Sequence, residues 1–284
     1  MPHEDSGGGV RPASRRLKVE DGELAYETSG DGPPLLFVHS AIADSRMWGR
    51  ELQVFAHGNR AIRFDLRGFG GSTPATKPFS YVEDIAALLS HLRADRPYLV
   101  GSSMGGAFAI NFALEHPEKV RGLCLVAPGM SGGFHPPFSR EEQTALDYDD
   151  QKSQGIAEAW SKGEGPRAIE LLRELWCSAL EGANLDLFRA MVEQNAAEVF
   201  DDRSGKQAVK MPPAEGRLGG LRVPTTIIQG DRDNPSSACF SRRIANAVPG
   251  AHLVTISGAD HLVNLSRASA FDEALRGALA GVRP

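Results

Sequence analysis

Six short, almost continuously apolar runs separated by helical patterns constrain the fold of this chain more than any other feature. Runs of this kind are typical of strands that are buried on both faces of a parallel sheet. Between them, apolar residues recur at helical spacing in 81–93, in 104–116 and in 271–282. This alternation predicts a doubly wound, mostly parallel α/β sheet with right-handed crossovers. The six runs are PLLFVHS (34–40), RAIRFDL (60–66), PYLVGSS (97–103), VRGLCLVAP (120–128), PTTIIQG (224–230) and AHLVTIS (251–257).

The N-terminal part of the chain adds a predicted hairpin to this sheet. Apolar and polar residues alternate over about 16–28 around an Asp21–Gly22 turn, so we expect about eight strands in all. Residues 1–15 combine Gly, Pro and charge without the apolar segment of a targeting signal. We interpret them as a flexible leader, followed by the first part of the core domain at 16–129.

The segment 130–221, called the insertion below, interrupts the alternation because it has helix signals but no strand signal. Ser139 with the glutamate three residues later forms a capping-box pattern, Pro166 is typical of a first helical turn, and Asn184 is a predicted cap. Structureless loops of this length are uncommon in compact domains. We therefore expect a helical lid inserted after the sixth strand, with the core domain resuming at 222–284.

Length, charge and cysteine content narrow the class of protein. A chain of 284 residues with 41% hydrophobic and 24% charged residues suits a globular domain. Its formal net charge of −5 gives no footprint for nucleic acid or an anionic membrane surface, and no stretch reaches the ~18 apolar residues of a membrane span. Three cysteines without a C-x-x-C pair predict no disulfide framework. We expect a cytoplasmic protein with a small-molecule partner; the oligomeric state stays open.

A serine doublet in LVGSSMGGAF (99–108) lies where an expected strand turns into an expected helix. In this setting G-x-S-x-G is the pattern of a nucleophile elbow, whose sharp turn requires small residues two positions before and after the serine. Ser103 has Gly101 and Gly105 at these positions, whereas Ser102 has Val100 and Met104. Steric reasoning therefore selects Ser103.

A serine hydroxyl needs a nearby base that an acid orients. His261, in ISGADHLVNL, follows the last predicted strand, at the sheet edge where reacting groups of open α/β sheets collect. The preceding strand ends in IIQGDRDNP and offers Asp231 and Asp233; we favour Asp233, which lies further into the loop. Asp260 adjoins His261, and neighbouring side chains tend to diverge. The order Ser103, Asp233, His261 is the chain order of this type of triad.

Together these motifs give the chain a resemblance to the α/β-hydrolase superfamily, and within it to the 3-oxoadipate enol-lactonases and small serine esterases. Matching segments are HSAIADSRMW (39–48), DLRGFGGS (65–72), GSSMGG, GDRD and GADH. The resemblance implies an α/β-hydrolase fold and an oxyanion hole formed by the backbone N–H groups of Met104 and Ala41. His39, Ser40 and Trp176 are further pocket candidates, although His39 is expected to hold its loop and Trp176 to pack the insertion.

The expected function is hydrolysis of a carboxylic ester or lactone of a small organic molecule through an acyl-enzyme. No H-E-x-x-H, paired-His or Walker sequence appears, so catalysis is expected without a metal or cofactor. The elbow carries serine, not the aspartate of the dehalogenases and epoxide hydrolases of this superfamily. C–C bond hydrolysis, perhydrolysis, biosynthetic cyclisation or acyl transfer, and a non-catalytic receptor role remain alternatives.

Overall fold

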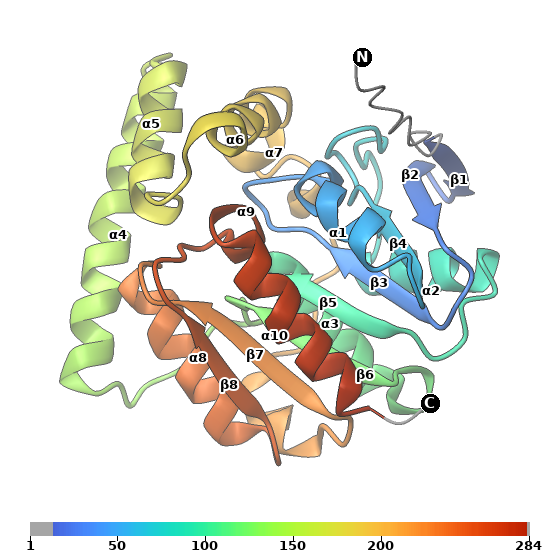
Figure 1. Ribbon diagram of the computed structural model, residues 1–284. Coiled ribbons are helices and arrows are strands. Elements are labelled where there is room, and N and C mark those ends of the chain that lie inside the picture. The colour runs from blue at the N-terminus through green and yellow to red at the C-terminus, as the bar shows by residue number, and fades with distance from the viewer. Residues whose placement is uncertain (1–13, 283–284) are drawn as a thin grey trace, which may run out of the picture.

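The computed structural model describes residues 14–282, which contain an eight-stranded sheet in the order β1-β2-β4-β3-β5-β6-β7-β8 (Figure 1). The hairpin β1–β2 is antiparallel and β2 pairs antiparallel with β4; all further neighbours are parallel. The predicted mostly parallel α/β sheet is confirmed. The strands are β1 Arg15–Val19, β2 Gly22–Ser29, β3 Pro34–Val38, β4 Arg60–Phe64, β5 Tyr98–Ser102, β6 Gly122–Val126, β7 Thr225–Gly230 and β8 His252–Ile256. The expected leader, apart from its last two residues, lies outside the described part.

Helices cover both faces of the sheet, because successive strand residues point into two different apolar cores. In β5, Leu99 packs into one core together with α2, α3 and α8, while Tyr98 and Val100 pack into the other together with α1 and α10. This alternation explains why the central strands read as continuous apolar runs. The helices are α1 Gly49–Val54, α2 Tyr81–His91, α3 Met104–Glu115, α4 Arg140–Ser161, α5 Gly165–Trp176, α6 Gly182–Gln194, α7 Ala196–Val199, α8 Pro235–Ala247, α9 Val263–Ser266 and α10 Ala268–Ala280.

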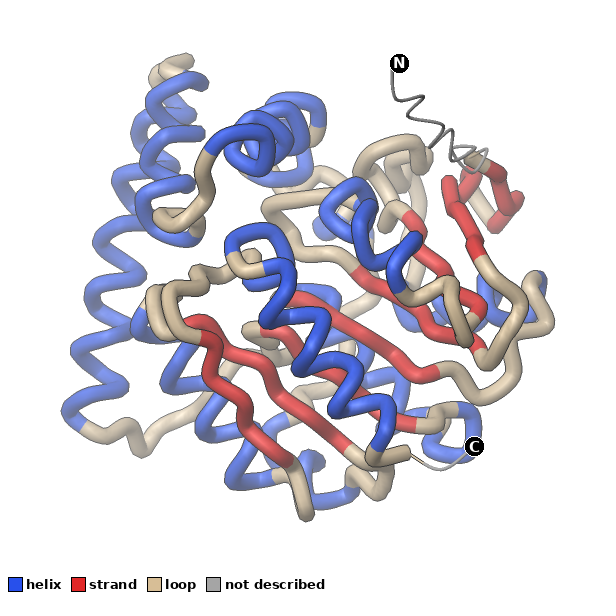
Figure 2. The backbone as a smooth tube through the Cα atoms, viewed as in Figure 1, coloured by secondary structure: helices blue, strands red, loops and turns tan. Residues whose placement is uncertain are grey.

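The chain between β6 and β7 contributes four α-helices, α4 to α7; the first half of α4 runs beside α8, whereas α5, α6 and α7 lie beyond one end of the strands (Figures 1 and 2). The capping box at Ser139 is present at the start of α4, and Pro166 lies in the first turn of α5, as predicted. Asn184 is not a cap: α6 begins at Gly182, and the Asn184 side chain donates to the carbonyl of Leu265. No helix within residues 14–282 is both long and apolar enough to cross a membrane.

The two ends of the insertion meet beside α3. The Ala214 N–H donates to the carbonyl of Ser131 at 3.1 Å, and the Ser131 hydroxyl donates to the carbonyl of Pro212 at 2.9 Å. Asn111 of α3 holds the same hydroxyl at 2.8 Å. The helical group therefore leaves and rejoins the core at one hydrogen-bonded stem.

One predicted strand differs from expectation in its surroundings. The run 251–257 predicts a strand buried on both faces, but β8 is the edge strand and only its last residue, Ile256, is buried. Leu253 is 38% exposed. The cause is topological, since nothing pairs with the outer edge of β8 in the described residues.

A buried polar cluster lies on the face of the sheet that α1, α9 and α10 cover. Glu51 is fully buried, and one of its carboxyl oxygens lies 3.4 Å from the amide nitrogen of Asn264. The other oxygen, Oε1, has no hydrogen-bond partner among the described residues. Burial raises the pKa of Glu51 to about 8, and the nearby Asp272 carboxylate adds to the shift. This carboxyl is therefore protonated across the neutral range.

Candidate active site

The serine doublet divides into a strand residue and an elbow residue. Ser102 ends β5, is fully buried, and its hydroxyl has no partner among the described residues. Ser103 follows with φ 51° and ψ −115°, a conformation that L-residues rarely adopt. A side chain on Gly101 would overlap backbone atoms of Gly105 and Gly106, so the turn requires glycine there. The strain lies at Ser103, and its side chain is partly exposed at the carboxyl edge of the sheet.

His261 is held by Asp233. The imidazole Nδ1 lies 3.0 Å from both carboxylate oxygens, and because a carboxylate only accepts, Nδ1 donates and Nε2 keeps a free lone pair. The Asp233 carboxylate also accepts from the side chains of Gln229 and Ser237, each at 2.7 Å, and from the Asn234 N–H at 2.7 Å. The acid is thus fixed before it orients the histidine.

The two other candidate aspartates serve the loops. Asp231 accepts from the Ser257 hydroxyl and the Gly258 N–H, which joins the loops after β7 and β8. Asp260 is buried and accepts from the N–H of Ala179 at 2.9 Å, toward the insertion. Of the three aspartates weighed, only Asp233 hydrogen-bonds to the imidazole.

The carboxylates around His261 set its charge state. Burial alone would lower the pKa of the imidazole, but the charge of Asp233 and its hydrogen bond outweigh burial, with smaller contributions from Asp260 and Asp149. The pKa of His261 is consequently raised above its usual value. Such a histidine accepts a proton readily and holds it as a paired cation.

The backbone N–H groups expected to form an oxyanion hole belong to Met104, at the start of α3, and to Ala41, in the loop after β3. The start of α3 packs closely against the end of β3. A side chain on Gly105 would lie 2.5 Å from the carbonyl oxygen of Val38 and 2.6 Å from that of His39, so glycine brings the start of α3 against the end of β3. Met104 is the first residue of α3, whose N–H the helix leaves without a partner. Ala41 lies in the loop directly after β3.

His39 and Ser40 are buried and do not line the cavity that contains Ser103. The His39 Nδ1 bonds to the carbonyl of Ser40 at 2.9 Å, and its Nε2 accepts from the N–H of Leu66 at 2.9 Å. Both ring nitrogens are therefore used to fix the loop after β3 against the loop after β4. These contacts fit a structural role for His39 in this loop. Neither His39 nor Ser40 contributes to the cavity wall, where both were pocket candidates.

Ser103 and His261 line one cavity of about 400 Å³ under the insertion. Trp176 lies beside His261 with ring centroids 4.6 Å apart, and its carbonyl accepts from the His261 N–H at 3.0 Å. Trp176 therefore both closes α5 and lines the pocket. No hydrogen bond joins Ser103 Oγ to His261 in the described structure, and such contacts often tighten only when substrate binds. The rest of the lining is Ala127, Pro128, Gly129, Met130, Gly133, Phe134, Leu146, Asp149, Ser236, Ser237 and Phe240.

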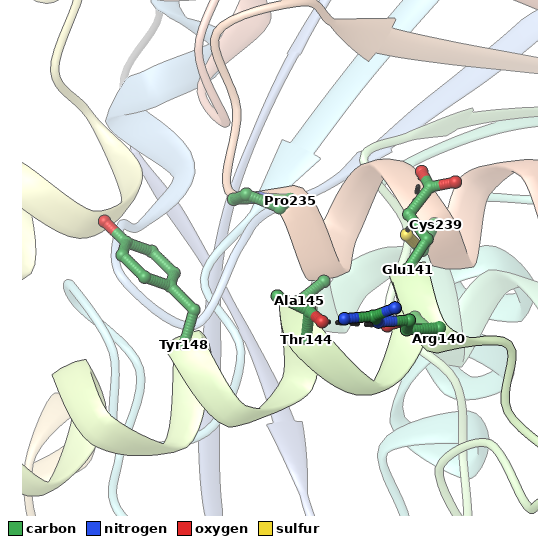
Figure 3. A pocket seen from close by; sticks show the side chains of 7 residues that line it. All are labelled: Arg140, Glu141, Thr144, Ala145, Tyr148, Pro235 and Cys239. Atoms are coloured by element: carbon green, nitrogen blue, oxygen red, sulfur yellow. Dashed lines mark hydrogen bonds between the residues drawn. The ribbon is translucent and has the colours of Figure 1, made fainter.

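A second hollow, of about 500 Å³, lies on the outside of the α4–α8 contact (Figure 3). Tyr148 and Thr144 on α4 and Pro235 on α8 form part of its wall, and the Thr144 hydroxyl donates to the carbonyl of Arg140. Its one thiol, Cys239, has a pKa that burial raises. Although this hollow is larger, its raised thiol pKa disfavours the reactive thiolate, so the cavity with Ser103 is the stronger candidate site.

Several site residues were missed by sequence reasoning. Gln229 carries a usable signal, because a polar residue at the end of a buried apolar strand usually has a buried partner, here Asp233. Asp149, Phe134 and Phe240 carry no such signal, since only the docking of the insertion on α8 brings them to the cavity.

Comparison with known proteins places these features in a family. The family model described as "alpha/beta hydrolase fold" matches residues 33–268. The pimeloyl-(acyl-carrier protein) methyl ester esterase of Chromobacterium violaceum is 28% identical, over 89% of this chain and 96% of that protein. The 2-hydroxy-6-oxononadienedioate/2-hydroxy-6-oxononatrienedioate hydrolase of Cupriavidus pinatubonensis is 23% identical, over 91% and 92%.

Among solved structures, a thermophilic esterase from Thermogutta terrifontis superposes with a TM-score of 0.77 at 25% identity, covering 95% of this chain and all of that one. The match extends across the core strands and the insertion alike, as its coverage requires. The chain belongs to the α/β-hydrolase family.

Proposed function

We propose that this protein is a serine hydrolase that cleaves a carboxylic ester or lactone of a small organic molecule. Ser103 Oγ attacks the carbonyl carbon while His261 Nε2 takes the hydroxyl proton, and Asp233 orients the imidazole and stabilises its cation. The N–H groups of Met104 and Ala41 stabilise the oxyanion. His261 then returns the proton to the leaving alcohol. A water activated by the same nitrogen cleaves the acyl-enzyme and frees Ser103.

The observation that carries the proposal is the pairing of His261 with Asp233 on the wall of the cavity that also contains Ser103. A strained serine alone would also fit a structural turn. A strained serine that shares a cavity with an imidazole whose pKa a fixed carboxylate raises supplies the nucleophile and the base that nucleophilic catalysis needs. The relatives include a methyl ester esterase and a 2-hydroxy-6-oxononadienedioate hydrolase. Membership of the family therefore supports hydrolysis but does not determine which type of bond is cleaved.

The insertion is proposed to act as the lid of this site, because α4 and α5 contribute Leu146, Asp149 and Trp176 to the cavity wall. Its partner is then a small molecule that fits about 400 Å³. We propose no nucleic-acid or membrane partner, and we expect the reaction to take place in the cytoplasm.

Labelling with a fluorophosphonate followed by peptide mapping tests the assignment. We expect one adduct, on Ser103, that is absent from Ser103→Ala and from protein unfolded before labelling. Ser102→Ala is the matched control: it removes a buried hydroxyl without a hydrogen-bond partner, so this variant should fold with unchanged or slightly higher stability. It should keep label and activity.

A panel of short esters, lactones and vinylogous diketones then identifies the bond that is cleaved. Activity on esters or lactones that falls by roughly 10³-fold or more in Ser103→Ala supports the proposal. An adduct on Ser102, or a folded protein that takes no label, refutes it. Label on Ser103 with cleavage of diketones alone would move the assignment to C–C hydrolysis.

A further inference from the structure

A single carboxylate from the insertion, Asp149, lines the catalytic cavity. Its Oδ1 accepts from the Asn234 amide at 2.9 Å and its Oδ2 from the Ser236 hydroxyl at 3.1 Å. Both donors belong to the start of α8, directly after the catalytic acid candidate Asp233. The carboxylate therefore has a fixed position in the wall that also contains Ser103.

The charge of this carboxylate acts inside the cavity. Asp149 is one of the groups whose negative charge raises the pKa of His261. Burial raises the pKa of Asp149 itself, while its hydrogen bonds to Ser236 and Asn234 act in the opposite direction. Both oxygens accept hydrogen bonds from neutral donors, and no Lys or Arg pairs with this carboxyl among the described residues.

No Lys or Arg is among the described residues that line the cavity. The guanidinium of Arg243 stacks on Phe134, 5.3 Å from its ring centroid. It is already paired with Glu215 and, at 3.5 Å, with Glu142. The Asp233 carboxylate is hydrogen-bonded to His261, and the imidazole balances its charge only when the ring is protonated. Asp149 therefore leaves the cavity with an uncompensated negative charge.

We propose that this site selects substrates without a negative charge, and that Asp149 is the residue that excludes carboxylate-bearing esters. The inference rests on the hydrolase function proposed above. A substrate carboxylate inside a cavity of about 400 Å³ lies within several ångströms of Asp149, and no Lys or Arg of the described lining is there to pair with it. At the effective dielectric of a protein site, the repulsion between two such charges corresponds to about tenfold or more in binding.

Matched pairs of esters test the selection at about pH 8, a high pH that favours the ionised carboxylate because burial raises the pKa of Asp149. para-Nitrophenyl butyrate and para-nitrophenyl hemisuccinate have acyl groups of the same length, and only the second ends in a carboxylate. para-Carbamoylphenyl and para-carboxyphenyl butyrate place the same difference on the leaving group. Spontaneous hydrolysis is subtracted by using Ser103→Ala. We expect kcat/KM to favour the neutral member of at least one pair by about tenfold or more.

Asp149→Asn should reduce this ratio by about tenfold, since the amide keeps the shape of the side chain and removes its charge. Asp147→Asn is the control: Asp147 is an exposed residue of the same helix whose one side-chain hydrogen bond within residues 14–282 comes from Gln143, and its loss changes the net charge equally. The ratio should stay at its original value in this variant. Equal rates on both members of both pairs, a ratio unchanged in Asp149→Asn, or an equal change in Asp147→Asn would overturn the inference.

Binding separates a failure of this inference from a failure of the proposed function. Ser103→Ala protein is titrated with the two para-nitrophenyl esters, and quenching of tryptophan fluorescence is followed, because Trp176 lines the cavity. If no ester is hydrolysed, the hydrolase proposal fails while the affinity ratio still measures charge selection. Equal affinities for the two esters, in that case, contradict the role of Asp149 as well.

Discussion

Replacing Glu51 with glutamine should change how the stability of this protein depends on pH. In the folded protein the pKa of this carboxyl is about 8, whereas an unfolded chain gives a glutamate about 4.3. Because the folded value is raised, the folded state keeps the proton that the unfolded state loses. The stability associated with the neutral carboxyl is fully present below about pH 4 and is lost as the pH rises through 8.

The magnitude follows from linkage. Each unit between the two pKa values costs about 1.4 kcal/mol, so the wild type loses roughly 3 to 4 kcal/mol by pH 7 and about 5 kcal/mol once the folded carboxyl has ionised. Glutamine has the same shape and does not titrate. Relative to the wild type, Glu51→Gln should therefore be increasingly stable as the pH rises from about 5 to about 8.

Urea unfolding of both proteins at several pH values, followed by circular dichroism, measures this difference. Glu193→Gln, at an exposed position of α6, is the control for loss of one negative charge. A difference in unfolding free energy between wild type and Glu51→Gln that stays constant between about pH 5 and about pH 8 would refute the reasoning. So would the same pH-dependent gain in Glu193→Gln.

Two further predictions concern the site and its support. Gly105→Ala places a methyl group against the carbonyl oxygens of Val38 and His39, which should displace the elbow and lower kcat/KM by about 10²-fold. Gly155→Ala is the control, because no described atom lies within 4 Å of the added methyl group, and its stability should rise by about 0.5 to 1 kcal/mol. An equal effect of both variants on kcat/KM would contradict the steric argument. Asp233→Asn should lower kcat by about 10⁴-fold and move the acidic limb of kcat/KM to lower pH, since the charge that raises the pKa of His261 is removed; an unmoved limb would speak against His261 as the base.

The core of the fold was predictable because its signals are local. Six apolar runs and the Asp21–Gly22 hairpin correspond to the eight strands, and the choice of Ser103 over Ser102 depended only on residues two positions away. Two helices of the insertion, α4 and α5, were also recognisable, from the capping box at Ser139 and from Pro166 in a first turn. In each case a short stretch of sequence determines its own backbone.

The pocket wall was not predictable, since it depends on how distant elements dock. Asp149 contacts residues more than eighty positions away, and nothing in the sequence of α4 indicates which face meets α8. The prediction that β8 is buried on both faces was wrong for a related reason, because strand order decides which strand lies at the edge of the sheet. Asn184 shows the same limit on a smaller scale: its amide reaches Leu265, so tertiary contact replaced the expected cap.

Because of the hydrogen-bonded stem at Ser131, the helices of the insertion can change with little effect on the core domain. Backbone and side-chain hydrogen bonds hold the two ends of the insertion together. The insertion is therefore a closed loop whose ends stay in place on the core. Closure entropy changes only slowly with the length of such a loop. Lengthening, shortening or replacing the helices therefore alters the shape and charge of the pocket roof at little cost to the sheet. Under the function proposed above, substrate range can therefore change through replacements confined to residues 130–221, while the groups at the strand ends keep their positions.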